Sequence, residues 1–463
     1  MGLKILVRGR KDASAVKHAV RAIQKDPYIT VESLGGVRGD KLCDLAHERA
    51  EPLTIVLLDR SAPPNCVVRK PLVETVRSSA SKIRNLPLQS IVSLISRGRA
   101  GLRIRYSWYK GSILMSAHVG EPLESLEVTP EGDSFLLYSR GIEMVSRLTG
   151  IPSRVSPGEV AVLIKAGGGS HMLYGGREPS VKMRFARDST KPVVEYSNPP
   201  ITGLSLDALL ETNSGVLREL ERISLEMLSR EVRGRAVVPL SGGKDSSAAL
   251  ILAVKALGPD RVTAVYVDTG IDFDENREYA ERLASRLGVE LLTERADVDR
   301  GLIIERLPLP TAKNRWCTGR KLAALHRAIR RVASSARITI VVGDRDAESS
   351  KRSLRPPVRL DESLNLPVVA PLKYWAGAHV ETYLHLEGVE PNPLYLMGFL
   401  RLGCYLCFAL RPSWELQLLL HSGYYKRVLR DKPEQAQLIK RFLGATLGEG
   451  LSSGRGEKAR ANN

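Results

Sequence analysis

The chain has 463 residues and a formal net charge of +18 at pH 7, and it contains no apolar run long enough to cross a membrane. This length predicts two or three domains, each large enough to bury its own core. Charged residues interrupt the amino-terminal apolar run from Lys4 onwards. This pattern is not typical of a secretory signal, and we expect a cytoplasmic protein with no membrane partner.

Positive charge is concentrated in the first hundred residues. They carry 18 Lys and Arg against 9 Asp and Glu, whereas residues 251–300 carry 7 against 11. This basic front half favours an anionic partner such as tRNA or another RNA. The alternative is the solvated surface of a heat-adapted protein, a class in which glutamine is as scarce as it is here.

Short strands alternating with helices are predicted for the first sixty residues, followed by a proline-rich break. We interpret this pattern as a basic amino-terminal α/β domain over 1–95. The predicted strands and helices are, in chain order, 3–9, 13–24, 28–34, 41–49 and 53–59.

A strand-rich α+β domain with its linker is predicted over 96–200. Alternating apolar patterns begin near Arg97, and one helical segment is predicted at 133–148. The glycine runs after Lys165 lack the G-x-G-x-x-G spacing and are typical of hairpin turns.

From 201 to 425, strands alternate regularly with longer helices. This alternation predicts an α/β fold with a doubly wound, Rossmann-like parallel sheet that is covered on both faces. Helices up to Leu447 and then a disordered tail are predicted for the carboxyl-terminal segment, 426–463. The predicted elements of the 201–425 domain are 205–233, 236–240, 244–257, 262–268, 274–287, 289–294, 320–333 and 337–344.

The segment "SGGKDS", 241–246, lies between a predicted strand and a predicted helix. Its glycines let backbone amides approach an anion, and its serines and the helix amino terminus add donors and a favourable dipole. The segment therefore predicts a phosphate site at the carboxyl end of a parallel strand. A serine-capped glycine turn without a ligand is the structural alternative.

This segment resembles the signature of the PP-loop ATP pyrophosphatases, and further stretches are similar to phosphoadenosine phosphosulfate (PAPS) reductases and their archaeal relatives. The resemblance covers 237–411 and implies a PP-loop domain that binds ATP or a sulfonucleotide, adenosine phosphosulfate (APS) or PAPS, together with Mg²⁺. The further stretches are "VYVDTGIDFDENREYAERLASRLGV", "GDRDAESSKR", "APLKYWAGAHVETYL" and "NPLYLMGFLRLGCYLC".

The same resemblance implies the residues of the site. Cationic side chains and the loop aspartate would stabilise transferred phosphate or sulfate groups, and strand-end residues would meet ribose, adenine or magnesium. The predicted catalytic residues are Lys244, Asp245, Arg345 and Arg352. The predicted nucleotide contacts are Ser241, Gly242, Gly243, Ser246, Ser247, Asp268, Thr269, Gly270, Glu348 and Ser349.

Cys317, Cys404 and Cys407 resemble the cysteines of iron-sulfur sulfonucleotide reductases. Those enzymes have a Cys-Cys pair where this chain has Trp316-Cys317. The remaining three thiolates imply a [4Fe-4S] cluster with one open iron, as in certain tRNA thiolation enzymes of the superfamily. A zinc site, a redox pair or a structural disulfide remain alternatives. The other two cysteines, Cys43 and Cys66, are predicted to be buried or incidental.

Three functions follow from these expectations. The favoured one is ATP-dependent adenylation of an acceptor, with tRNA as the implied class, followed by Fe-S-assisted sulfur transfer from a sulfur donor. The second is reduction of APS or PAPS with a thiol reductant, although the family's reductases use a carboxyl-terminal cysteine and no cysteine follows Cys407. The third is a nucleic-acid-binding protein with a degenerate nucleotide site.

Overall fold

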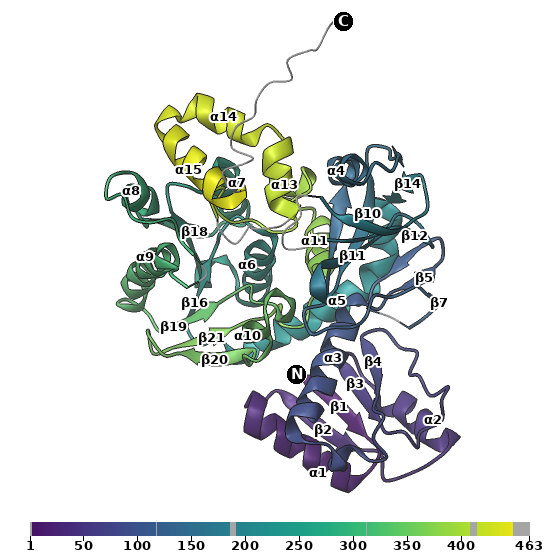
Figure 1. Ribbon diagram of the computed structural model, residues 1–463. Coiled ribbons are helices and arrows are strands. Elements are labelled where there is room, and N and C mark those ends of the chain that lie inside the picture. Colours follow the sequence, from purple (N-terminus) through teal and green to yellow (C-terminus); the bar gives the residue numbers. More distant parts are fainter. Residues whose placement is uncertain (1, 117, 186–190, 312, 408–413, 448–463) are drawn as a thin grey trace, which may run out of the picture.

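A computed structural model of the chain describes residues 2–116, 118–185, 191–311, 313–407 and 414–447. Figure 1 shows a small amino-terminal sheet at the bottom, a strand-rich unit at the upper right and a larger α/β unit at the left. The predicted disordered tail lies outside the described residues. No helix in the described ranges has both the length and the apolar character needed to span a bilayer.

The amino-terminal unit is a parallel sheet of four strands in the order β2-β1-β3-β4. The predicted strands and helices are confirmed, except that the first helix ends in a π-helical turn. The fourth strand was not predicted, because it is short, half polar and preceded by prolines. The elements are β1 (Leu3–Val7), α1 (Arg10–Ala19), η1 (Val20–Gln24), β2 (Ile29–Ser33), α2 (Asp40–Arg49), β3 (Thr54–Leu58), β4 (Val73–Arg77) and η2 (Ile83–Asn85).

Cys43 and Cys66 form a disulfide bond in this unit. The bond joins helix α2 to the loop that precedes β4, and Cys66 is buried. Of the prediction that these two cysteines are buried or incidental, burial is confirmed for Cys66. The disulfide bond was not predicted, because sequence separation does not reveal that the loop folds back over the helix.

Two predictions for the middle of the chain are wrong. Residues 97–104 are helical and not extended, since they complete α3, whose apolar side chains recur at helical spacing against the first sheet. Residues 133–138 form the fully buried strand β8, and only the following residues form a helix. A short apolar run such as Phe135 to Tyr138 does not distinguish strand from helix by its periodicity.

The strand-rich unit is built around the antiparallel sheet β13-β12-β11-β10-β15, with β8 pairing with β10. Strands β10 and β11 form the predicted hairpin across the glycine run. The elements are α3 (Leu88–Ile104), β5 (Ser107–Tyr109), β6 (Ser112–Leu114), β7 (Glu121–Pro122), β8 (Asp133–Tyr138), α4 (Ser139–Thr149), β9 (Ser153–Arg154), β10 (Glu159–Lys165), η3 (Gly167–Gly169), β11 (Ser170–Tyr174), β12 (Pro179–Arg184), β13 (Val193–Ser197), β14 (Ile201–Thr202) and β15 (Leu204–Ser205).

The carboxyl-terminal unit contains the predicted doubly wound sheet, in the order β18-β17-β16-β19-β21-β20. All neighbouring strands are parallel except the edge strand β20. Ala236 and Val238 face one apolar cluster and Val237 faces another, so both faces of the sheet are covered. Figure 1 shows α6 and α7 on one face and α8 and α9 on the other.

The predicted helices and strands of this unit are confirmed to within a few residues at their ends. They are α5 (Leu206–Glu231), β16 (Arg235–Pro239), α6 (Lys244–Leu257), η4 (Pro259–Arg261), β17 (Val262–Asp268), α7 (Asp274–Arg286), β18 (Glu290–Arg295), α8 (Val298–Ile303), α9 (Trp316–Ala333), β19 (Ile338–Val341), η5 (Asp346–Glu348), α10 (Ser350–Ser353), β20 (Val358–Asp361), β21 (Leu366–Val369), α11 (Gly377–Leu386), α12 (Pro393–Leu396), α13 (Trp414–His421), α14 (Tyr424–Asp431), η7 (Pro433–Gln435) and α15 (Ala436–Leu447).

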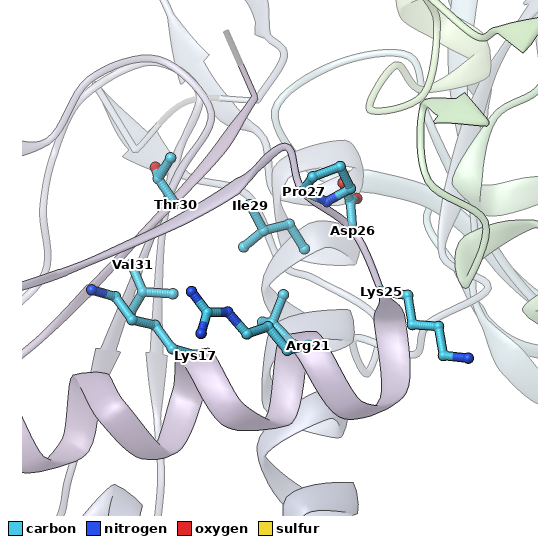
Figure 2. A pocket seen from close by; sticks show the side chains of 9 residues that line it. Lys17, Arg21, Lys25, Asp26, Pro27, Ile29, Thr30 and Val31 are labelled. Carbon is cyan, nitrogen blue, oxygen red and sulfur yellow. The ribbon is translucent and has the colours of Figure 1, made fainter. Parts of the chain in front are cut away.

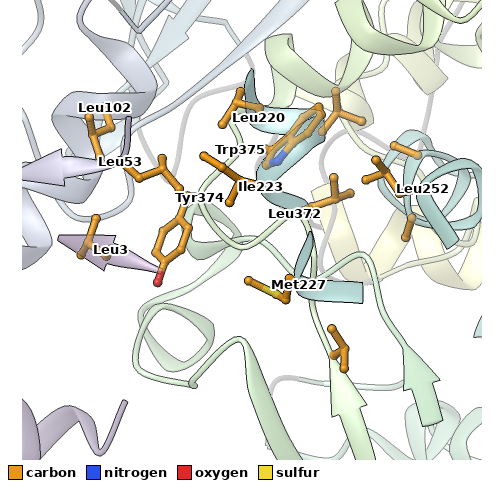
Figure 3. Close-up of a cluster of buried hydrophobic side chains, with 14 of the residues drawn as sticks. Leu3, Leu53, Leu102, Leu220, Ile223, Met227, Leu252, Leu372, Tyr374 and Trp375 are labelled. Atoms are coloured by element: carbon orange, nitrogen blue, oxygen red, sulfur yellow. The ribbon is translucent and has the colours of Figure 1, made fainter. Parts of the chain in front are cut away.

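One apolar cluster runs without interruption from the amino-terminal sheet into the carboxyl-terminal unit. Leu3 of β1, Leu53 directly before β3, Leu220 of α5 and Leu252 of α6 belong to it, together with Trp375. Figure 3 shows these side chains around the loop that carries Trp375. A shared core of this kind opposes independent movement of the units, because separating them would expose apolar surface to water.

Candidate nucleotide site

The "SGGKDS" segment forms the turn between β16 and α6, as the sequence predicts. Gly242 has a φ of +75°, and a Cβ at this position would lie 2.3 Å from the backbone oxygen of Asn276. Only glycine satisfies both conditions, since other residues rarely adopt this φ and would displace the start of α7.

Serine side chains hold the turn in shape. The Ser246 Oγ accepts a hydrogen bond from the Ser241 amide at 3.1 Å. The Ser246 and Ser247 hydroxyls each donate to the Gly243 carbonyl at 2.9 Å. Three of the predicted phosphate contacts, Ser241, Gly243 and Ser246, are thus joined in one hydrogen-bonded turn at the amino terminus of α6.

Two residues near helix α12 bind the same turn and were given no role from sequence. The Asn392 Nδ2 donates to the Gly242 carbonyl at 3.0 Å, and the Tyr395 hydroxyl accepts from the Lys244 amide at 2.9 Å. Both residues lie in the quoted "NPLYL" stretch, so their position within a motif was the only signal in the sequence.

The Lys244 side chain is enclosed, with 1% of its surface exposed. Its Nζ donates to the Leu400 carbonyl at 2.6 Å and lies 5.1 Å from the ring centre of Phe135 and 4.9 Å from that of Tyr395. Carbonyl and ring faces stabilise the buried ammonium group. The predicted contact of Lys244 with a nucleotide remains a prediction.

Arg345 lies inside the protein between two carboxylates. Its Nε donates to Asp245 Oδ1 at 2.7 Å, and its Nη1 donates to both oxygens of Asp133 at 2.9 and 3.0 Å. Burial disfavours the charge, but Asp133 and Asp245 together raise the pKa of Arg345. The arginine expected to meet phosphate oxygens is therefore the centre of a buried ion network that includes the loop aspartate.

The second predicted arginine, Arg352, is more accessible, with 39% of its side chain exposed. It pairs with Glu348 and lies 3.5 Å from Asp344. Burial and the neighbouring Asp245 raise the pKa of Glu348, whose Oε2 accepts the Arg345 amide at 2.9 Å. The Ser349 Oγ accepts the Arg352 amide at 3.2 Å and caps the short helix α10. The predicted residues of this element therefore lie together beside the turn.

Strand β17 ends at the predicted Asp268-Thr269-Gly270 turn. Asp268 accepts the Gly270 amide at 2.7 Å and pairs with Arg295 at 3.1 Å. Asp268, Gly270 and Asp272 line a cavity of about 310 Å³ beside this strand end. Oxygen ligands of this kind suit a hard cation, although Arg295 already neutralises Asp268.

The cysteine segment is attached to this turn. The Cys404 Sγ donates to Asp272 Oδ1 at 3.3 Å and lies 3.7 Å from the Thr269 hydroxyl oxygen. The Tyr405 amide donates to the Ile271 carbonyl at 3.3 Å. Burial and the Asp272 carboxylate raise the pKa of the Cys404 thiol well above its usual value.

The three free cysteines lie around one lysine. Lys321 of α9 interacts electrostatically with all three thiols, and although burial disfavours its charge, Asp272 and the thiols raise its pKa. The Asp272 carboxylate contacts Cys404, and Lys321 lies near all three sulfurs. In the described ranges, no three cysteine, histidine or acidic side chains converge closely enough to bind a metal ion.

Glu381 of α11 is a buried carboxyl group near Lys244 that the sequence did not single out. Its Oε2 accepts the Leu136 amide at 2.8 Å, and none of its surface is exposed. Burial raises the pKa of Glu381 to about 8, and the nearby Lys244 charge only partly opposes this effect. The group therefore favours its neutral form at pH 7.

The P-L-x-x-W stretch has a packing role. Trp375 has 1% of its surface exposed and its Nε1 donates to the Ser224 hydroxyl at 3.3 Å. Lys373 is buried and pairs with Asp346 at 2.6 Å. This motif therefore fixes the position of the loop before α11 and makes no part of an accessible surface.

Comparisons with known proteins agree with the geometry. Residues 235–410 match the family model described as the phosphoadenosine phosphosulfate reductase domain. An uncharacterized protein of Methanocaldococcus jannaschii is 29% identical over 262 residues, which are 55% of this chain and 51% of that protein. The sulfate adenylyltransferase subunit 2 of Mycolicibacterium gilvum is 39% identical over 99 residues, 20% of this chain and 32% of that protein.

Among solved structures, the PAPS reductase of Candida auris in a phosphate complex has 15% sequence identity and a TM-score of 0.34, covering 42% of this chain and 97% of its own. The match with the archaeal protein spans about half the length of that relative. The family match covers the loop, the strand-end turn, the arginine element and the cysteine segment, which meet at the carboxyl ends of neighbouring strands. Residues 235–410 of this chain thus match the phosphoadenosine phosphosulfate reductase domain family.

Proposed function

We propose that the protein binds ATP at the turn of residues 241–246 and adenylates an acceptor, releasing pyrophosphate. Sulfur from a donor then attacks the activated carbon of the acceptor, and AMP leaves with the acceptor oxygen. Loop amides, the amino terminus of α6 and a magnesium ion would stabilise the charge of the departing pyrophosphate. The similarity to a sulfate adenylyltransferase subunit supports adenylation as the first step.

The observation that carries this proposal is the position of Cys404. Its sulfur lies 3.7 Å from the hydroxyl oxygen of Thr269, a predicted nucleotide contact. A free thiol in contact with a turn that is predicted to bind a nucleotide supports sulfur chemistry on the activated group over simple nucleotide hydrolysis.

The [4Fe-4S] cluster and its zinc alternative enter no step of this proposal, because no three cysteine, histidine or acidic side chains are grouped for a metal ion among the described residues. Metal analysis of protein purified without oxygen tests this conclusion. About four iron and four sulfide ions per chain would show that the protein binds a [4Fe-4S] cluster. One zinc ion per chain would instead show that the protein has a zinc site.

An RNA, with tRNA as the class that the resemblance implies, is the acceptor that we propose. Support comes from the net charge of +18 and from a basic pocket of about 550 Å³ between α1 and β2. Lys17, Arg21 and Lys25 line this pocket, and Figure 2 shows Lys17 and Arg21 extending from the helix toward the strand. Cations spaced along a helix suit the phosphates of a nucleic-acid backbone.

Reduction of APS or PAPS is the second candidate, and the family match of residues 235–410 favours it. A thiol of Cys317, of the Cys404/Cys407 pair or of a partner protein would attack the sulfur atom of the sulfonucleotide, with AMP or adenosine 3',5'-bisphosphate as leaving group. A thiol reductant would then release sulfite. The lack of any cysteine after Cys407 counts against this reaction.

Nucleotide preference separates the two candidates. Dissociation constants for ATP, APS and PAPS should be measured by calorimetry on the full chain, followed by pyrophosphate release with bulk tRNA. We expect ATP to bind most tightly and pyrophosphate release to disappear in Lys244→Ala and Asp245→Ala. Sulfite formation from APS or PAPS, without ATP turnover, would establish the reductase instead.

A further inference from the structure

We infer that Asp133, a residue of the strand-rich unit, is a positioning residue of the nucleotide site, because it holds Arg345 and through it the loop aspartate Asp245. The inference deepens the proposed function and rests on it. Asp133 lies outside the family match, which begins at residue 235. An added part of the chain therefore completes the PAPS reductase domain.

The contacts form a continuous and buried chain. Asp133 is 4% exposed and Arg345 is 2% exposed. The Arg345 guanidinium reaches Asp133 at 2.9 Å on one edge and Asp245 at 2.7 Å through its Nε. Asp245 is the only one of the three with a sizeable exposed fraction, 23% of its side chain.

Backbone hydrogen bonds fix the Asp133 carboxylate. Its Oδ1 accepts the Gly377 amide at 2.9 Å and the Ser134 amide at 3.0 Å. The Arg345 charge lowers the pKa of Asp133 although burial alone would raise it. Asp133 thus stays ionised in a fixed place, and the planar guanidinium has a fixed partner to align with.

If Asp133 lost its charge, the other acidic side chains near Arg345 would move closer to the guanidinium. A buried guanidinium that loses one carboxylate is strongly destabilised unless another moves closer. Asp245 and Glu348 are the acidic groups that interact with Arg345 besides Asp133. Since Asp245 lies in the turn, its movement toward Arg345 would distort the predicted phosphate site.

The same strand contacts the other charged residue of the turn. Phe135 of β8 lies under the Lys244 ammonium group, and the Leu136 amide binds Glu381. Two positions of β8 therefore lie against the charged residues of the turn, Phe135 at Lys244 directly and Asp133 at Asp245 through Arg345. Strand β8 therefore packs against the turn through Phe135.

If Asp133 only joined the two units, losing it would affect the turn no more than losing another contact between the units. Tyr138, at the end of the same strand, also joins the strand-rich unit to α11, because its hydroxyl lies 2.8 Å from His385 Nε2. The hydrogen bonds and ion pairs of the described residues give the Tyr138 side chain no partner in the 241–246 turn. Tyr138→Phe is therefore a matched control that removes one contact between the units without reaching the turn.

The test uses Asp133→Asn in the full chain, since the amide oxygen can still accept the Gly377 amide while the charge is lost. We expect amide hydrogen exchange of residues 241–247 to rise by at least about tenfold relative to β17 in the same sample. The dissociation constant for ATP should rise by a similar factor. Tyr138→Phe should change neither quantity.

The double variant Asp133→Asn/Arg345→Gln removes both charges of the pair and serves if the single variant does not fold. It should also show increased turn exchange, because Asp245 then loses its contact with Arg345. Equal effects of Asp133→Asn and Tyr138→Phe, or no effect of either Asp133 variant on the turn, would overturn the inference. If exchange responds as expected but wild-type protein does not bind ATP, the proposed function fails and the positioning role stands.

Discussion

Cys404 and Asp272 are 132 residues apart in the chain, yet the Cys404 thiol donates a hydrogen bond to the Asp272 carboxylate at 3.3 Å. This bond ties the cysteine segment to the turn after β17. The negative charge of Asp272, together with burial, raises the pKa of the thiol.

Replacing this carboxylate should make Cys404 more reactive. In Asp272→Asn the pKa of Cys404 falls, so a larger fraction is thiolate at pH 8, and the thiolate is the nucleophile. We expect alkylation of Cys404 by iodoacetamide to accelerate by about tenfold or more. Peptide mass spectrometry would follow Cys404 and Cys317 in the same sample.

Asp274→Asn is the matched control, because this neighbouring carboxylate pairs with Lys432 and makes no hydrogen bond to the thiol among the described residues. It should leave the alkylation rate of Cys404 near the wild-type value. An unchanged rate in Asp272→Asn would show that the carboxylate does not control this thiol.

Gly242→Ala should destabilise the protein and weaken nucleotide binding. The new Cβ would lie 2.3 Å from the Asn276 oxygen, and the φ of +75° is strained for alanine. A cost of about 1 to 3 kcal/mol in the free energy of unfolding follows from such strain. Urea denaturation without nucleotide would measure it.

Gly243→Ala provides the comparison, since the nearest atoms to its added Cβ are the Ser241 and Tyr395 side-chain oxygens at 3.4 Å. It should unfold close to wild type in the absence of nucleotide. Equal destabilisation by the two variants would refute the special geometry of Gly242.

The stability of the protein should depend on pH through Glu381. Its pKa is about 8 in the folded protein and near 4.5 in an unfolded chain. The unfolded state therefore binds fewer protons between these values, and the free energy of unfolding falls as the pH rises from 4.5 to about 8. In Glu381→Gln this loss should disappear, as measured by denaturation at several pH values.

Glu221→Gln should change the pH dependence in the opposite direction. Burial opposes ionisation of Glu221, but Lys255 and Arg218 lower its pKa below the usual value. Its contribution is present above the unfolded pKa and is lost as the pH falls, so the variant should lose stability chiefly at neutral pH. Parallel pH profiles for the two variants would contradict both assignments.

The basic pocket should contribute to RNA binding through phosphate contacts. Replacing Lys17, Arg21 and Lys25 by glutamine should lower the slope of log affinity against log salt by up to about 3 for bulk tRNA. Replacing Arg38 and Lys41, exposed cations of the same unit outside the pocket, should change the slope less. An equal decrease per replaced cation for both sets would indicate a diffuse charge effect and no specific surface.

Local sequence patterns predicted the elements of the carboxyl-terminal sheet because each element satisfies its own periodicity. The helix 244–257 is observed with the same bounds, and the strand 262–268 likewise. Patterns failed where a segment is short and apolar, as at 133–138, or follows prolines, as at 73–77. In those places pairing with a distant strand decides the conformation.

The order and spacing of the loop, the strand-end turn, the arginine element and the cysteines were determined by the sequence alone, because each is a short stretch whose chemistry is visible locally. Only the tertiary structure decided how these parts are connected. It placed Arg345 between Asp133 and Asp245, bonded Cys43 to Cys66 and set Cys404 against Asp272. Such pairings join residues that are separated in the chain. They form only when the packing of the three units brings two buried charged groups, or a thiol and its partner, into contact.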